Sequence, residues 1–190
     1  MEIIQKIDFS ILEFLQSIHN DFLNSFMHFF TFLGDKGFIW IVLTLFLLIV
    51  PQTRRIGIYL AVTLAVLTLV NEVGIKSIFQ RNRPFIQQPL LFETIIPRPS
   101  GYSFPSSHAA SSFASATSIY KFNKPIGIAA YIIAGIIALS RIYFGVHFPT
   151  DIIVGALVGV ITALIINKLL NSVTKKLSGK GNEGKSNYNL

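Results

Sequence analysis

Four long apolar stretches constrain this chain more than any other feature of its sequence. They run from Gly37 to Val50, from Ile56 to about Ile75, from Pro125 to Leu139 and from Ile152 to Ile166. A helix needs about 20 mostly apolar residues to cross a hydrocarbon core, so flanking polar residues or tilt must complete several spans. With 190 residues, of which 52% are hydrophobic and 13% charged, the chain has no room for a second globular domain. We therefore expect an all-α, polytopic membrane bundle of about five or six helices.

Two further segments bring the chain to that number of helices. The stretch from His108 to Tyr120 is rich in Ala and Ser, and small residues let helices pack closely inside a membrane. The stretch from Ile11 to Leu33 has Phe, Leu and Ile at helical spacing, but polar residues interrupt it. These are Glu13, His19, Asn20 and Asp21. Residues 1–36 are therefore compatible with an interfacial helix and with a first membrane helix.

Basic residues in the short connections predict the orientation of the bundle. Arg54 and Arg55 lie in one connection, Lys121 and Lys124 lie in another, and further lysines follow the last apolar stretch. Counting helices between these three places puts them all on one side, which the positive-inside rule makes cytoplasmic. The connections at 76–107 and 141–150 then share the external face.

The end of the chain has a different composition. Residues 178–190 are rich in Gly, Asn, Ser and Lys and have almost nothing to bury, so we expect a disordered basic cytoplasmic tail after a membrane domain at 1–177. The net charge of +7 could indicate nucleic acid, but five of the sixteen basic residues lie at or beyond the last apolar stretch. These are Lys168, Lys175, Lys176, Lys180 and Lys185. That position is typical of a lipid-facing tail, and we expect no nucleic-acid partner.

Three groups of polar residues are concentrated in the connections predicted to be external. They are Lys76 with Arg83-Pro84, then Pro105-Ser106-Ser107-His108, then Ser140-Arg141 followed by His147 and Asp151. External cations run against the positive-inside trend unless they have another task, and binding an anion is such a task.

The order and spacing of these groups resemble the three-part signature of the type 2 phosphatidic acid phosphatase family. The resemblance covers about Lys76 to Asp151 and implies a six-helix phosphatase fold that works through a phosphohistidine. Similar proteins act on phosphatidic acid, phosphatidylglycerol phosphate or undecaprenyl diphosphate, a lipid carrier that is recycled for cell-wall synthesis. The compact, cysteine-free chain is similar to bacterial members, which favours the last two lipids. Ser107 stands where the family usually has glycine, which would be costly at a positive φ, but serine is small and we expect activity to survive.

The chemistry of these residue types points the same way. A phosphoryl transition state spreads negative charge over its oxygens, and Lys76, Arg83 and Arg141 can supply fixed positive charge around it. The two arginines can offer bidentate contacts, and lysine can act as a point charge. Ser106 and Ser107 precede an apolar helical run, so their backbone amides and a hydroxyl could hold a phosphate oxygen at a helix N-terminus.

The two histidines complete a catalytic set. His147 is predicted to be the nucleophile, because a neutral imidazole can attack phosphorus when a partner keeps its other nitrogen protonated. Asp151 lies four residues later and shares a face with His147 if a helix begins near Pro149. His108 is predicted to be the general acid toward the leaving alkoxide and later the base toward water.

Other polar residues have less specific interpretations. His19 and His28 are expected to be interfacial or hydrogen-bonded residues without a catalytic role. Arg81 and Arg98, which lie outside the signature, are expected to face solvent or to steer the substrate. The segment from Phe85 to Pro99 is expected to cover the headgroup.

No cofactor and no metal ion are expected, because arginine and lysine take the place of divalent ions and no carboxylate cluster is available to bind one. The partners expected are a lipid phosphate substrate and the bilayer, and the sequence does not indicate an oligomeric state. Two alternatives remain: a phosphotransferase that uses the same phosphohistidine, and a non-catalytic protein that binds, flips or transports lipids. The complete set of nucleophile, orienting carboxylate and acid favours hydrolysis.

Overall fold

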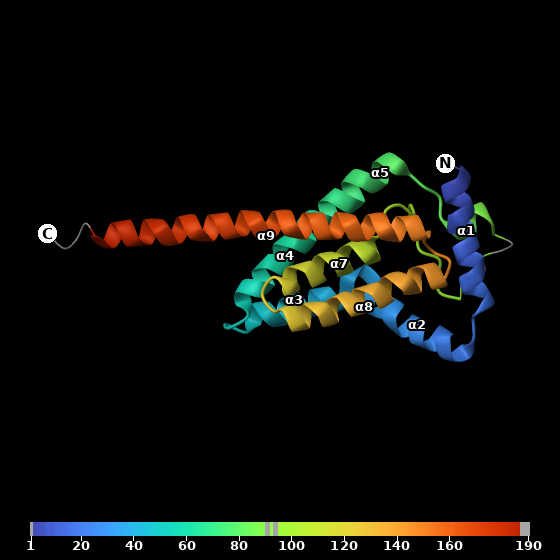
Figure 1. The fold of residues 1–190 in the computed structure, drawn as a ribbon, viewed down its shortest axis with the longest axis horizontal. Coiled ribbons are helices and arrows are strands. Elements are labelled where there is room, and N and C mark those ends of the chain that lie inside the picture. Colours follow the sequence, from blue (N-terminus) through green and yellow to red (C-terminus); the bar gives the residue numbers. More distant parts are fainter. Residues whose placement is uncertain (1, 90–91, 93–94, 187–190) are drawn as a thin grey trace.

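The computed structural model describes residues 2–89, 92 and 95–186, and within this part of the chain every regular element is a helix (Figure 1). The long elements are α1 (Glu2–Ser17), α2 (Asp21–Gly34), α3 (Phe38–Ile49), α4 (Arg54–Thr68), α7 (Ser107–Tyr120), α8 (Lys124–Tyr143) and α9 (Pro149–Ser186). The short elements are the 3₁₀ turn η1 (Asp35–Gly37), the π-helix η2 (Leu69–Ile75), α5 (Lys76–Phe79) and α6 (Pro84–Gln87). The predicted all-α class is confirmed.

Four segments of the described chain are long and apolar enough to cross a membrane. They are Asp21–Ile49, Arg54–Gln87, Lys124–Tyr143 and Pro149–Lys176, and each contains all or nearly all of one of the four apolar stretches. The first of them bends at η1, where Lys36 and Gly37 have left-handed φ values of 51° and 72°. The prediction of a polytopic membrane protein is therefore confirmed.

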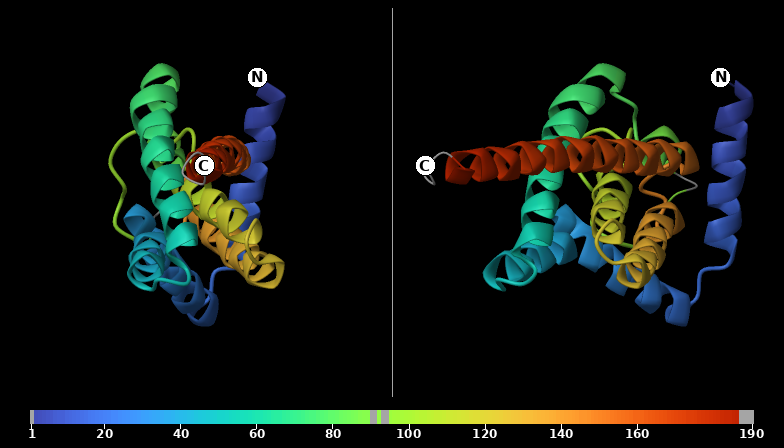
Figure 2. Two further views of the ribbon diagram at one scale, coloured as in Figure 1. Left: turned by 90° about the vertical axis from the view of Figure 1, so that its left-hand side faces the viewer. Right: turned by 60° about the vertical axis from the view of Figure 1, so that its left-hand side comes forward.

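The stretch from Ile11 to Leu33 is divided between two helices. Asn20 ends the continuity, because its side-chain oxygen accepts a hydrogen bond from the backbone N–H of Leu23 at 3.0 Å and caps α2. α2 then leads into α3 as part of a candidate span. α1 instead stands across the end of the bundle, steeply inclined to α9 in both Figure 1 and Figure 2.

Helix α7 is the centre of the bundle and packs against α4, α8 and α9. Its alanines and serines allow close packing, and α9 contributes Gly155 and Gly159 on the facing side. A Cβ atom at Gly155 would clash with the backbone oxygen of Ser106, and one at Gly159 would clash with that of Ala110. The backbones of α7 and α9 are therefore in direct contact near the start of α7.

The three predicted basic regions gather at the far end of the bundle. Lys121 donates to the backbone oxygen of Asn167 at 3.1 Å, and the hydroxyl of Tyr59, one turn after Arg55, donates to Asn171 at 2.9 Å. The backbone of α9 is helical through Ser186 and so includes most of the segment for which composition predicts disorder. Residues 187–190 lie outside the described part, and the domain boundary at 177 stays a prediction.

Candidate active site

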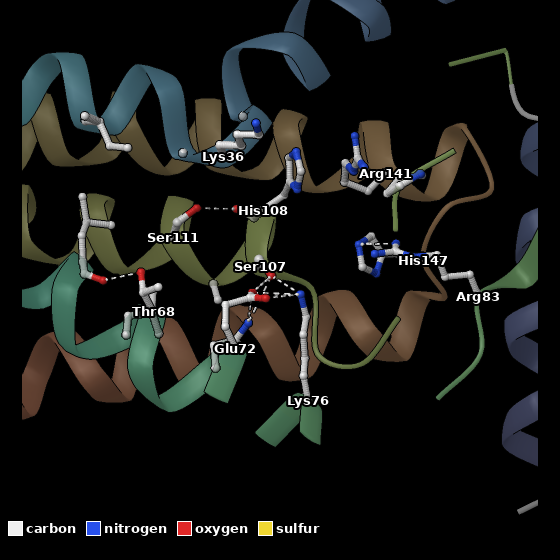
Figure 3. A pocket seen from close by; sticks show the side chains of 18 residues that line it. Lys36, Thr68, Glu72, Lys76, Arg83, Ser107, His108, Ser111, Arg141 and His147 are labelled. Carbon is white, nitrogen blue, oxygen red and sulfur yellow. Dashed lines mark hydrogen bonds and ion pairs between the residues drawn. The ribbon is translucent and has the colours of Figure 1, made fainter. Parts of the chain in front are cut away.

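The opposite end of the bundle contains a cavity of about 400 Å³ with two chemically different parts (Figure 3). Its polar part is lined by Lys76, Arg83, Ser107, His108, Arg141 and His147. Its apolar part includes Ile41 of α3 and Leu64 and Leu67 of α4. The three sequence groups therefore meet in one space, and that space continues along α3 and α4, which belong to two of the candidate membrane spans.

His147 lies in the short connection between α8 and α9 with its ring 3% exposed. Arg83 Nη1 lies 3.2 Å from His147 Nε2. Because a guanidinium can only donate, Nε2 must accept this hydrogen bond and carry the lone pair, which assigns the ring proton to Nδ1. Burial lowers the pKa of His147 to about 3, which keeps the ring neutral at ordinary pH. Nε2 is thus the nitrogen available for attack.

Asp151 stands behind His147 and is completely buried. α9 begins at Pro149, as the sequence predicted, and this puts the two side chains on one face with Nδ1 of His147 3.6 Å from Oδ2 of Asp151. That separation is longer than a hydrogen bond, so the carboxylate lies beside Nδ1, which has no hydrogen-bond partner among the described residues. The same oxygen accepts the backbone N–H of Phe148 at 2.9 Å and the hydroxyl of Ser103, which hold the carboxylate in place.

Arg83 uses all five of its N–H groups on the protein. Apart from His147, its acceptors are four backbone oxygens at 2.9 to 3.2 Å. These belong to Ser100, Gly101, Tyr102 and Val146. The side chain is 4% exposed, so it fixes the two loops that form the cavity wall and brings a positive charge beside Nε2. The bidentate phosphate contact expected from the sequence would require it to release some of these acceptors.

His108 is paired with a carboxylate that the sequence analysis did not identify. Its Nε2 lies 2.9 Å from Oδ1 of Asp35, which belongs to the η1 turn between α2 and α3. The same oxygen is 3.7 Å from Nη1 of Arg141. The local sequence Gly-Asp-Lys-Gly is typical of a turn and carries no sign of a catalytic carboxylate. Asp35 therefore links the predicted acid to one of the predicted anion-binding cations.

Arg141 lies in the last turn of α8 and is 3% exposed. Its Nη1 donates to the hydroxyl of Thr31, whereas its Nε–H has no partner among the described residues. A buried donor without an acceptor is costly, and here it belongs to a cation that lines the cavity. An anion in the cavity could accept from it.

Lys76 and Ser107 form a polar cluster on the other wall (Figure 3). Lys76 Nζ lies 2.9 Å from Oε1 of Glu72 and 2.6 Å from the hydroxyl of Ser107, which also bonds to Glu72. The π-helix η2 places Glu72 here, and such irregular turns are frequent at functional sites. Ser107 is the first residue of α7 and is absent from the described residues with positive φ, so the glycine of the family is not needed for its backbone.

Ser106 has a structural contact rather than a place in the cavity lining. It is the N-cap of α7, where its hydroxyl accepts the N–H of Ala109 at 3.5 Å, and it is fully buried. A direct contact between this hydroxyl and phosphate stays a prediction.

The prediction for Arg81 is wrong. Its guanidinium is 24% exposed and is bound by Asp8 and Asp151 at 2.7 Å each, so it neither faces solvent freely nor points at the substrate. Arg98 is exposed and lies 5.5 Å from the ring of Phe85, which agrees with the solvent-facing alternative.

The remaining predictions have separate outcomes. His19 is hydrogen-bonded to the backbone oxygen of Tyr143 at 3.0 Å, which agrees with its interpretation as a hydrogen-bonded residue, and His28 is exposed on α2. Of the segment from Phe85 to Pro99, positions 90, 91, 93 and 94 lie outside the described residues. Within its described part, Pro99 lines the cavity. Three more side chains of this segment, Phe85, Phe92 and Ile96, lie in an apolar cluster with Phe148.

Comparison with known proteins assigns this chain to a family. The family model described as the PAP2 superfamily matches residues 55–175, which include all three sequence groups. The chain belongs to the PAP2 superfamily. Among curated PAP2 relatives it is similar to an undecaprenyl-diphosphatase of Sulfolobus acidocaldarius, with 35% identity over 160 residues, 82% of this chain and 75% of the relative. It is also similar to the undecaprenyl-diphosphatase BcrC of Bacillus subtilis, with 29% identity over 149 residues, 78% of this chain and 76% of the relative.

A solved structure shares the fold of this PAP2 protein. It is the crystal structure of a transmembrane PAP2-type phosphatidylglycerolphosphate phosphatase from Bacillus subtilis, with a TM-score of 0.77 and 24% identity. The alignment covers 91% of this chain and 89% of that chain. The protein is therefore a membrane member of a lipid phosphatase family, with the architecture expected from its sequence.

Proposed function

We propose that this PAP2 protein hydrolyses a lipid phosphate or diphosphate, with His147 as the nucleophile. The observation that carries the proposal is the position of His147 Nε2, which holds a lone pair at the wall of a cationic cavity that continues into an apolar groove. A phosphate headgroup fits the first part, and its hydrocarbon chain fits the second. The names of the relatives favour undecaprenyl diphosphate, and phosphatidylglycerol phosphate is the second candidate.

In the first step Nε2 attacks phosphorus, a P–N bond forms and the bond to the leaving oxygen breaks. Arg83 Nη1 then loses its acceptor on Nε2, and the freed N–H can donate to a phosphoryl oxygen instead. The unpaired Nε–H of Arg141 and the ammonium of Lys76 can hold the other oxygens. The phosphorylated ring is cationic, and Asp151 lies on its Nδ1 side to balance that charge.

His108 serves the leaving oxygen and then water. It gives a proton to the departing alkoxide, or to the lipid monophosphate that leaves a diphosphate, and later accepts a proton from the water that attacks the P–N bond. Asp35 accepts from Nε2–H of His108, so Nδ1 is the nitrogen left for this exchange. His108 must therefore enter the first step as an imidazolium, with a second proton on Nδ1 taken from solvent, and it regains that proton from the attacking water.

The direct test measures inorganic phosphate released from purified lipids by the protein in detergent. His147→Ala should abolish release, and His108→Ala should slow it while leaving attack by His147 possible. With a ³²P-labelled lipid phosphate, His108→Ala should therefore accumulate an acid-labile, base-stable phosphoenzyme that His147→Ala lacks. Full activity of His147→Ala would overturn the mechanism.

The same test separates the two alternatives. A phosphotransferase would convert a competing alcohol to its phosphate ester at the expense of inorganic phosphate. A lipid-binding or transport protein would retain the lipid without releasing phosphate. Rates on undecaprenyl diphosphate, phosphatidylglycerol phosphate and phosphatidic acid, measured side by side, would rank the substrates.

We further propose that hydrolysis is independent of metal ions, because Lys76, Arg83 and Arg141 supply the positive charge. Activity should persist in a chelator, and strict dependence on added magnesium would contradict this assignment.

The active site is proposed to face the external side, with the basic end and the tail in the cytoplasm. The chain has no cysteine, so single cysteines report position without background. On intact cells an impermeant maleimide should label Ser100→Cys. It should label Gln52→Cys only after the cells have been permeabilised. The reverse pattern would invert the topology.

A further inference from the structure

Asp151 is held from behind by a cation that lies outside the cavity. Arg81 Nη1 donates to Oδ1 of Asp151 at 2.7 Å, whereas His147, Ser103 and Phe148 all contact Oδ2. Arg81 follows Gln80, the C-cap of α5, whose backbone is left-handed. The guanidinium carbon of Arg81 lies 3.9 Å from the centroid of the Phe148 ring. The outer oxygen of the carboxylate is therefore fixed by Arg81.

Arg81 is in turn shared with a second carboxylate, from the N-terminal helix. Its Nη2 donates to Oδ2 of Asp8 at 2.7 Å. Thr150 connects the same groups, because its hydroxyl accepts from Arg81 at 2.7 Å and lies 2.6 Å from Asp8, while its backbone N–H donates to Asp8 at 3.1 Å. A continuous chain of contacts thus runs from α1 through Arg81 and Asp151 to His147.

Simple anchoring of α1 does not explain this arrangement. Asp8 and Leu12 are the buried residues of α1, and Leu12 already packs in an apolar cluster with Phe148. A buried carboxylate costs free energy unless it is paired, so an apolar residue would anchor the helix more cheaply. What Asp8 adds is a negative charge on Arg81.

We propose that Asp8 and Arg81 are positioning residues for the His147–Asp151 pair, so that α1 is part of the catalytic apparatus. With Asp8 present, Asp8, Arg81 and Asp151 together carry one negative charge, which balances the cationic ring formed when Nε2 is phosphorylated. Without Asp8, Arg81 would neutralise Asp151. No net negative charge would then balance the cationic ring of phosphorylated His147, which lies near Arg83 and Arg141. This inference rests on the proposed function of His147.

The test compares Asp8→Asn with Leu12→Ala, two buried positions on the same helix. Asparagine keeps the shape and can still accept from Thr150, but it removes the charge. Activity is measured per folded protein, with thermal unfolding in detergent as the check. We expect Asp8→Asn to lower kcat and the single-turnover rate of phosphoenzyme formation at least tenfold with KM within twofold. Leu12→Ala should lower thermal stability and keep kcat.

Unchanged kcat in Asp8→Asn, or an equal loss of kcat in both variants, would overturn the positioning role. If Asp8→Asn does not fold, Arg81→Lys replaces it, because lysine keeps the charge but lacks the fork that joins two carboxylates. That variant should lose kcat at least fivefold with KM unchanged, and wild-type kcat would again overturn the inference. Wild-type protein is assayed in parallel, and its failure to release phosphate would overturn the proposed function itself.

Discussion

The two histidines of the cavity rest on carboxylates with very different surroundings. Asp151, beside His147, is completely buried and is held by Arg81, Ser103 and Phe148. Asp35, beside His108, is 56% exposed and lies in a 3₁₀ turn. The proposed nucleophile thus has rigid support, and the proposed acid has support that water can reach. This difference matches their tasks, since one must keep its orientation and the other must exchange protons.

The largest effect should come from removing the charge on the rigid side. Asp151→Asn places an amide where its N–H can face Nδ1 of His147, which favours the tautomer with the proton on Nε2. We expect kcat to fall roughly 10³-fold, by analogy with the carboxylate of a catalytic triad. Steady-state kinetics on folded protein would measure it, and a loss below tenfold would remove the contrast between the two pairs.

The matched change on the exposed side is Asp35→Asn. Water can replace part of the contact to His108, and exposed ion pairs contribute little, so we expect kcat to fall about tenfold or less. The same kinetic assay applies. A loss as large as that of Asp151→Asn would show that His108 needs equally rigid support.

A smaller effect is expected from restoring the glycine of the family signature. Ser107→Gly removes the hydroxyl that contacts Lys76 and Glu72 but requires no change of φ. Because the lost contacts are partly exposed, kcat/KM should change by about threefold at most. Rates on the preferred lipid would decide this, and a hundredfold change would make the serine a specificity residue.

The smallest effect should be that of pH on His147. Burial lowers its pKa to about 3, so the ring stays neutral between pH 8 and pH 5 and protonation should not slow its attack. A histidine with the ordinary pKa of about 6.5 would lose roughly tenfold of its neutral form between pH 7 and pH 5.5. Phosphoenzyme formation from an aryl phosphate in His108→Ala isolates this step. The rate of phosphoenzyme formation should vary less than about twofold between pH 7 and pH 5.5. A tenfold fall over this range would contradict the buried environment of His147.

The sequence was sufficient for the parts of this protein that depend on local pattern. Apolar stretches predicted the spans, and the spacing of Lys76, Arg83, His108, Arg141 and His147 predicted residues that line one cavity. The N-cap at Asn20 could have divided the first stretch, because Asn followed by Asp is a helix-start signal.

Two carboxylates that support the site could not be predicted, because each comes from a distant part of the chain. Asp8 reaches Arg81 across 73 positions, and Asp35 reaches His108 across 73 positions as well. A single carboxylate in an apolar helix or in a Gly-rich turn carries no sequence signal of what it will meet. Glu72 could have been found from the sequence, because Glu and Lys four residues apart pair on one face of a helix.

The close contact of α7 with α9 fixes the relative position of two residues of the candidate active site. At Gly155 and Gly159 the two backbones are too close for any side chain, and His108 and Asp151 lie in the first turns of these two helices. The separation between the proposed acid and the carboxylate behind the proposed nucleophile is therefore set from inside the bundle. Residues on the lipid-facing surface can change to suit new hydrocarbon chains while this spacing stays constant.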